Sequence, residues 1–245
     1  MLPTNSRPGI MTSPQTTPRS NAFNAGDRRI LFLASILGFI SGYAGAQMPH
    51  TLPFARTALE LTEGQMSAIF AGVRAASLLG VLFAMQADRT GRRKPILAAF
   101  TLLLLGSLAT ALIPSVAAYV VSQSLVRIAL IAVSALTLVL IAEELNPGVR
   151  ALGIGVYGLA GSLGVGLGLV LLPIAENNDN AWRVLFAIAA LGLLALPLLA
   201  RFLPESRAFT PAARIPFTKA LGMGLSRHFW PLAGVSFFIA AFSSP

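Results

Sequence analysis

Six long apolar segments, separated by short polar connections, constrain this chain more than any other feature of its sequence. A helix that crosses a bilayer needs about 20 mostly apolar residues, and an open sheet would leave edge groups unsatisfied in lipid. Charged residues make up only 11% of the 245, against about 25% in a soluble domain. We therefore predict an all-α membrane protein. Its spans are expected at about Ile30–Met48, Gln65–Met85, Pro95–Ile113, Ala117–Ile141, Ala151–Ile174 and Arg183–Leu203.

The ends of the chain differ from this apolar middle. Residues 1–28 are rich in Pro, Ser, Thr and Asn without an apolar period, which predicts a disordered cytoplasmic tail. Residues 29–207 form the expected six-helix unit, and residues 208–228 a cytoplasmic connection. Another apolar run begins at Phe229, so residues 229–245 are expected to be an incomplete seventh helix.

Basic residues gather in alternate connections. The formal charge is +9, but a nucleic-acid partner is not predicted, because the basic residues lie between apolar runs rather than on one soluble face. The positive-inside rule instead places the N-terminus in the cytoplasm of a multi-pass inner-membrane protein. The supporting residues are Arg28 and Arg29 before the first span, Arg89, Arg92, Arg93 and Lys94 after the second, and Arg201, Arg207, Arg214, Lys219 and Arg227 after the sixth.

The connection between the second and third spans carries a recognisable motif. Its matching positions are Asp88, Arg89, Gly91, Arg93 and Lys94, with Ala84 where a glycine would lead the pattern. The segment resembles the signature loop of the major facilitator superfamily, in the connection where that family carries it. Gly91 would permit a tight turn, and Asp88 would pair with cations at a helix end. We expect this loop to govern conformational switching.

Two weaker motifs support the resemblance. One holds Glu143, Glu144 and Arg150 after the fourth span, and the other holds Glu205 and Arg207 after the sixth. Both resemble segments of the sugar and metabolite porters. The resemblance implies one half of a twelve-helix fold, built from two three-helix repeats, with the carrier's own C-terminal half as partner.

Glycines are dense in the fifth expected span. Gly155, Gly164 and Gly168 fall at spacings similar to an antiporter signature of the same family, but Leu169 stands where a proline would follow. Small residues at helical spacing are typical of close helix packing in lipid. We therefore interpret this run as a packing face, and symport remains the expected mode.

Two arginines lie within the expected spans. Arg74 is nine residues into the second and Arg127 about ten into the fourth, so both are expected near the midplane, where a charge is costly. The sequence has no Asp or Glu deep in any of the six spans. A guanidinium group suits a carboxylate or a phosphate, so we predict that both arginines bind substrate. Their charges would be compensated either by an anionic solute or by carboxylates of the other half.

Polar residues of the first span are further candidates. Tyr43 and Gln47 are four residues apart on one helical face and are predicted to line the substrate cavity, with Tyr43 alternatively part of an interfacial aromatic belt. His50 and His228 are expected in loops, too isolated for a metal pair or a proton relay.

No catalytic constellation, phosphate loop or metal cluster is apparent, and the chain has no Cys. We therefore expect no enzyme, no cofactor and no metal. The predicted function is secondary active transport of a small solute, an organic anion being the first interpretation and a neutral sugar or drug the second. Protons or another coupling ion would drive it, because no nucleotide site exists. The rival is a non-transporting six-helix receptor or assembly subunit.

Overall fold

The computed structural model describes residues 24–112 and 114–205, and every regular element in this part of the chain is helical. Six helical stretches are long and apolar enough to cross a membrane, as predicted. The first span is α1 (Ala25–Ala58), and the third and fourth are α4 (Arg93–Leu112) and α5 (Val116–Glu144). The other three spans are interrupted. The second span consists of α2 (Glu63–Ala76), η1 (Ser77–Gly80) and α3 (Val81–Thr90). The fifth consists of α6 (Arg150–Val170) and η2 (Leu172–Glu176). The sixth consists of α7 (Trp182–Ala190), η3 (Leu191–Ala195) and α8 (Leu196–Phe202).

The first helix is longer than predicted at both ends. It begins at Ala25, inside the segment predicted as a disordered tail, because Asn24 and Asp27 form a reciprocal capping box that satisfies two backbone N–H groups. It continues through Pro49 and Pro53 to Ala58, although each proline removes one backbone hydrogen bond. The prediction that His50 lies in a loop is therefore wrong. Residues 208–228 and 229–245 lie outside the described residues.

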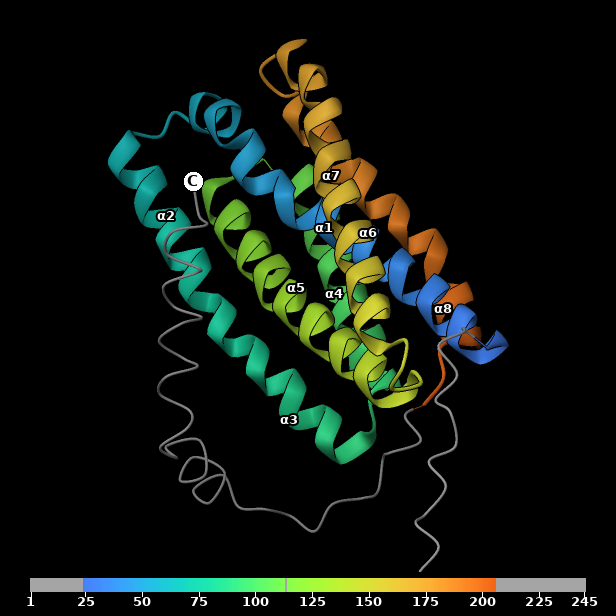
Figure 1. The fold of residues 1–245 in the computed structure, drawn as a ribbon. Helices are drawn as coiled ribbons and strands as arrows, with labels where there is room; N and C mark the ends of the chain where they lie inside the picture. Colours follow the sequence, from blue (N-terminus) through green and yellow to red (C-terminus); the bar gives the residue numbers. More distant parts are fainter. Residues whose placement is uncertain (1–23, 113, 206–245) are drawn as a thin grey trace, which may run out of the picture.

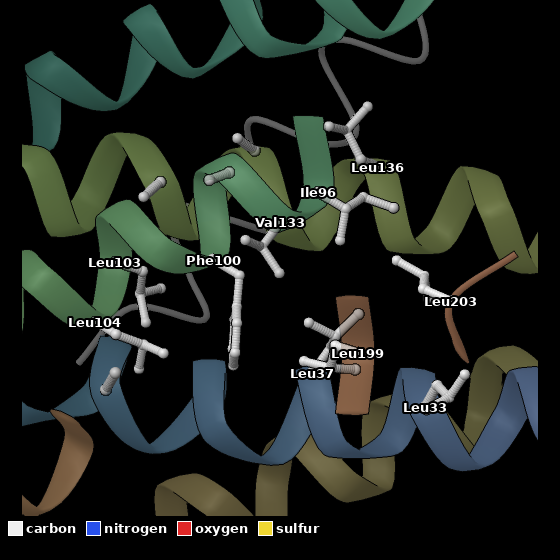
Figure 2. Close-up of a cluster of buried hydrophobic side chains, with 14 of the residues drawn as sticks. Leu33, Leu37, Ile96, Phe100, Leu103, Leu104, Val133, Leu136, Leu199 and Leu203 are labelled. Atoms are coloured by element: carbon white, nitrogen blue, oxygen red, sulfur yellow. The ribbon is translucent and has the colours of Figure 1, made fainter. Parts of the chain in front are cut away.

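The helices pack as two main pairs, α1 with α6 and α4 with α5, and α1 also contacts α5 and α7 (Figure 1). The largest apolar core lies where α1, α4, α5 and α8 meet. Figure 2 shows Leu37 of α1, Phe100 of α4 and Leu199 of α8 converging there, each fully buried. This core joins the first span to the last, so the six spans form one bundle.

Glycines set the distance between α1 and α6. A side-chain carbon added at Gly164 would overlap the backbone of Phe39 and Tyr43, and one added at Gly42 would overlap the backbone of Gly161. The predicted packing face is confirmed at Gly161, Gly164 and Gly168. Gly155, Gly158 and Gly166 instead have open space beside them. The glycine run therefore serves two faces of one helix, and only one of them is covered by α1.

The apolar surface is extensive. Leu78, Leu112, Val170 and Leu194 each expose more than two thirds of their side-chain area, which would be unfavourable in water and is the normal condition of a helix in lipid. The second span and α6 bury the smallest shares of their apolar windows. The protein is therefore a multi-pass membrane protein whose most exposed spans are the second and the fifth.

Candidate functional site

A polar network occupies one end of the bundle, where α1, α4 and α6 begin and α3, α5 and α8 end. We call this the basic end, after Arg29, Arg92, Arg93, Arg150 and Arg201, and the opposite end the distal end. At the basic end α3 terminates at Gly91, whose φ of 87° and ψ of 173° fall in a region that is open only to glycine. The predicted tight turn at Gly91 is confirmed.

Glu205, just after the last span, lies against this turn. Its Oε1 accepts from the backbone N–H of Arg92 at 2.6 Å and from that of Arg93 at 3.3 Å. These amides stand at the start of α4, where no preceding turn can accept from them, and where the helix dipole favours an anion. A side-chain carbon on Gly91 would collide with the Glu205 carboxylate. The glycine and the carboxylate therefore depend on each other.

A second connection joins the same turn to the end of α5. The Arg92 guanidinium donates to both carboxylate oxygens of Glu143, at 3.0 and 3.4 Å, and the two side chains are 19% and 24% exposed. Arg93 donates to the backbone carbonyl of Ala200 in α8. The three motifs found in the sequence thus meet at one place, although Arg92 is 51 positions from Glu143 and 113 from Glu205 along the chain.

The start of α1 is tied to the same end. Asp27 is 2% exposed, and it accepts from the Asn146 side chain at 2.7 Å and from the Asn146 backbone at 3.4 Å. Arg29 donates to the carbonyl of Phe202 at 2.6 and 3.2 Å. Sequence reasoning missed Arg92, Asp27 and Asn146 as members of the network. The capping pattern Asn24–Asp27 before an apolar run was the available signal for Asp27.

The remaining predicted members of the network differ in position. Lys94 is exposed, and Arg150 reaches the carbonyl of Leu145 at 3.5 Å. Glu144 is half-buried at the end of α5. Asp88 and Arg89 lie in the last turn of α3, and nothing is described of their side chains. Arg207 lies outside the described residues.

Arg74 and Arg127, the two predicted substrate-binding cations, come from facing helices. Arg74 is exposed on α2, with its guanidinium 4.6 Å from the centre of the Phe70 ring. Arg127 is half-buried on α5 and lies near enough to Arg74 for the two charges to repel. Leu130 and Ile131, one turn further along α5, meet Gly45 of α1 and Gly80 of η1. Arg127 therefore faces the space between the first and second spans.

Tyr43 and Gln47 lie inside the bundle. Tyr43 is buried and donates from its hydroxyl to the carbonyl of Leu185 in α7 at 3.1 Å. Gln47 is also buried and donates from Nε2 to the carbonyl of Tyr43 at 3.1 Å. Tyr43 packs toward α7 and Gln47 toward α6. Their predicted role in substrate binding stays a prediction.

The distal end holds a cavity and a neutral hydrogen-bond cluster. Arg56 and Glu63 pair at 2.6 Å across the connection from α1 to α2, and both line a cavity of about 410 Å³. Deeper in the bundle, Thr110 of α4 accepts from Gln123 at 2.8 Å and shares a 2.6 Å hydrogen bond with Ser122 of α5. Arg183 donates to the Thr110 carbonyl at 3.1 Å. These contacts join α4, α5 and α7.

Comparison with solved structures defines the class of protein. The inward-open xylose transporter XylE from E. coli superposes on 75% of this chain with a TM-score of 0.64 at 22% identity, and the match covers 49% of that transporter. A D-xylose–proton symporter matches 86% of the chain with a TM-score of 0.66 at 20% identity, over 56% of its own length. The six described spans therefore have the fold of one half of a major facilitator superfamily transporter.

Sequence comparison identifies the family. Residues 30–214 match the model of the family described as sugar (and other) transporter, and the chain belongs to that family. The arabinose–proton symporter of Escherichia coli K12 is 27% identical over 201 residues, which is 80% of this chain and 42% of the symporter. The myo-inositol transporter 3A of Cryptococcus neoformans is 28% identical over 187 residues, or 72% of this chain and 31% of that protein. The matches thus span 31% to 42% of the length of these relatives.

Proposed function

We propose that this chain is the N-terminal half of a secondary active transporter that moves a small polyhydroxylated solute, of the sugar or polyol class, together with protons. The family match over residues 30–214 carries the proposal. Relatives named as arabinose–proton and galactose–proton symporters support the solute class and the coupling ion. The described half supplies six spans, and the solute site would lie between this half and a second one, as in other carriers of this architecture.

Uptake by the full-length protein in proteoliposomes tests this function. We expect radiolabelled pentoses, hexoses or inositol to accumulate when the outside is more acidic than the inside, and to equilibrate without accumulation when a protonophore is added. A matched preparation of liposomes without protein sets the background. Absence of gradient-dependent uptake for every such solute would favour the rival, a non-transporting membrane receptor or assembly subunit.

We further propose that the basic end faces the cytoplasm of a bacterial-type inner membrane, as the positive-inside rule requires. Arg29, Arg92, Arg93 and Arg201 all belong to connections or helix termini at this end. A reporter fused after Asn177, in the connection on the distal side, should report an external location. A cytoplasmic signal there would reverse the assignment.

The network at the basic end is proposed to control the conformational cycle. Glu205, Gly91 and the Arg92–Glu143 pair connect the ends of three spans through contacts that can form and break as helix ends separate. Its residues lie at a helix terminus, far from the middle of the spans where a solute would bind. We expect Glu143→Gln to change the rate of turnover more than the affinity for solute, measured as kcat against KM for uptake.

A small organic anion is the second candidate solute. The observation that favours it is the position of Arg74 and Arg127 on facing helices, with mutually repelling charges. An anion between them would relieve that repulsion and would suit the planar guanidinium group. Uptake of acidic and neutral solutes by Arg74→Gln and Arg127→Gln carriers separates the candidates. Selective loss of acidic solutes supports the anion, and unchanged uptake of acids by both variants excludes it.

A further inference from the structure

We propose that His50, acting with Gln47, is the proton-binding site of this half of the carrier. The inference rests on the proposed proton-coupled transport and names the group that takes up the proton. His50 lies in α1 between Pro49 and Thr51, one turn after Gln47 on the same face of the helix. Both side chains face Gly168 of α6.

Two buried polar atoms, one on each side chain, have no hydrogen-bond partner here. Gln47 is 0% exposed, and its Oε1 has no hydrogen-bond partner, while its Nε2 is engaged by the Tyr43 carbonyl. The Nδ1 of His50 is also buried and has no partner. A side-chain carbon at Gly168 would lie 2.8 Å from Gln47 Nε2 and 3.3 Å from His50 Nδ1. Glycine at position 168 is therefore what leaves space for the pair.

Protonation changes what His50 can bind. A neutral imidazole with its proton on Nε2 presents Nδ1 as an acceptor, and this buried Nδ1 has no hydrogen-bond partner. A proton from water converts Nδ1 into a donor, and Gln47, one turn away, would turn its unpaired Oε1 toward His50 to accept that hydrogen bond. Release of that proton to water on the other side of the membrane restores the neutral pair. The step forms and breaks only the N–H bond, so it needs no redox partner.

Other proton carriers are poorly placed in the described spans. The carboxylates of the described residues lie at helix termini or in connections rather than within the apolar stretches; they are Asp27, Glu60, Glu63, Asp88, Glu143, Glu144, Glu176, Asp179 and Glu205. Histidine is the side chain whose ordinary titration falls between about pH 5 and 8. His50 is the one histidine of residues 24–112 and 114–205, so it is the natural candidate in this half.

Few charged groups surround His50. In the described residues, α6 carries only Arg150 and Tyr157 as titratable side chains, both nearer the basic end, and α4 carries Arg93 and Lys94 there. From η2 comes Glu176, which is exposed, and from α7 comes Arg183, which is directed to Thr110. The distal half also holds Tyr119 of α5, Tyr43 and Arg56 of α1, and the connection or helix-end carboxylates Glu60, Glu63 and Asp179. No carboxylate contact to His50 is formed among these residues, so Gln47 is the group that the proton would recruit.

The backbone around His50 is suited to respond. Pro49 and Pro53 flank it and lack the N–H groups that would bond to the carbonyls of Gly45 and Pro49. A positive charge on His50 would therefore lie in a part of α1 that lacks two internal hydrogen bonds. The same part of α1 contacts α6 at Gly168. A buried charge is costly without compensation, so protonation favours an arrangement that hydrates or pairs His50.

Uptake by the full-length carrier with His50→Gln tests the proposal, with His228→Gln as the matched histidine control. In the His50→Gln carrier we expect net uptake driven by a pH gradient to fall to the level measured without a gradient. Solute exchange, which needs no net proton movement, should persist. His228→Gln should retain the gradient response. If wild type itself shows no gradient response, the proposed proton coupling fails; if wild type responds and His50→Gln responds equally, only the assignment to His50 fails.

Two substitutions at Gln47 provide a readout that does not depend on the His50 variant folding. Gln47→Leu removes the acceptor and should move the pH midpoint of uptake to lower pH, because protonated His50 loses its partner. Gln47→Glu supplies a carboxylate and should move the midpoint to higher pH. Shifts in these opposite directions support the proposal. Unchanged midpoints in both variants overturn it.

Discussion

The two ends of this bundle are held together by different chemistry. At the basic end, charged side chains tie distant segments to one another: Glu205 to the start of α4, Arg92 to Glu143, and Asp27 to Asn146. At the distal end, the contacts between spans are mostly neutral hydrogen bonds around Thr110 and an edge-to-face stack of Tyr119, Trp182 and Phe186. The charged Arg183 contributes there through one hydrogen bond to the Thr110 carbonyl. The side chains of the Arg56–Glu63 ion pair on the distal surface are 43% and 84% exposed.

The difference suggests a hypothesis about which end separates during the transport cycle. Charge-assisted contacts are strong when formed, but their groups are readily hydrated when they separate, so they suit a boundary that opens to water. The stabilisation from apolar and aromatic contacts falls in proportion to the apolar area that becomes exposed to water. We therefore expect the basic end to carry switching contacts and the Thr110 cluster to remain closed throughout the cycle.

Breaking the turn at the basic end should have the largest effect. Gly91→Ala introduces a side chain where the backbone is glycine-only and where the Glu205 carboxylate already lies. We expect a loss of about 3 kcal/mol in the free energy of unfolding, from backbone strain and a displaced carboxylate. Denaturant unfolding in detergent measures it. Gly72→Ala on α2, with open space around it, is the control and should lose nothing, since alanine favours helix.

Removing the Arg92–Glu143 pair should have a smaller effect. The side chains are partly buried, so we expect a coupling energy of about 1.5 kcal/mol between the two positions. The measurement is a double-mutant cycle of Arg92→Gln and Glu143→Gln, followed by unfolding. Effects that simply add would mean that the pair contributes no coupling and that the basic end is not joined through it.

Truncating Glu205 should follow in size. Glu205→Ala removes the acceptor of two amides at the start of α4, at a cost of about 1 kcal/mol, reduced because the side chain is exposed. Glu205→Gln keeps an acceptor and should lose about half as much. Comparing the two unfolding transitions separates the hydrogen bond from the charge. Equal losses would assign the whole effect to charge.

The distal ion pair should matter least. Because Arg56 and Glu63 are largely exposed, we expect Arg56→Gln, Glu63→Gln and the double variant to change stability by less than about 0.5 kcal/mol. Unfolding at low and high salt checks this, since a surface pair is screened. A loss as large as that of the Arg92–Glu143 pair would show that the two ends are not held by different means.

The limits of sequence reasoning can be traced to particular residues. Apolar length located five spans to within a few residues, because a bilayer permits few alternatives to a helix. It stopped the first span at Met48, because prolines at 49 and 53 ordinarily end a helix, whereas α1 continues to Ala58. Because the predicted helix ended too early, His50 was assigned to a loop, whereas it lies on a face of α1. Spacing placed Tyr43 and Gln47 on one side of α1, but only the packing decided that they meet α7 and α6.

Composition and local pattern by themselves determined the membrane class, the number of spans in residues 24–205 and the glycine at the turn after α3. These depend on hydropathy over about 20 residues or on the backbone of a single position. Tertiary structure alone decided that Glu205 would cap α4, that Arg92 rather than Arg93 would pair with Glu143, and that Gln47 and His50 would meet Gly168. Such contacts join residues more than 50 positions apart, and only the packing of the helices fixes which side chains meet.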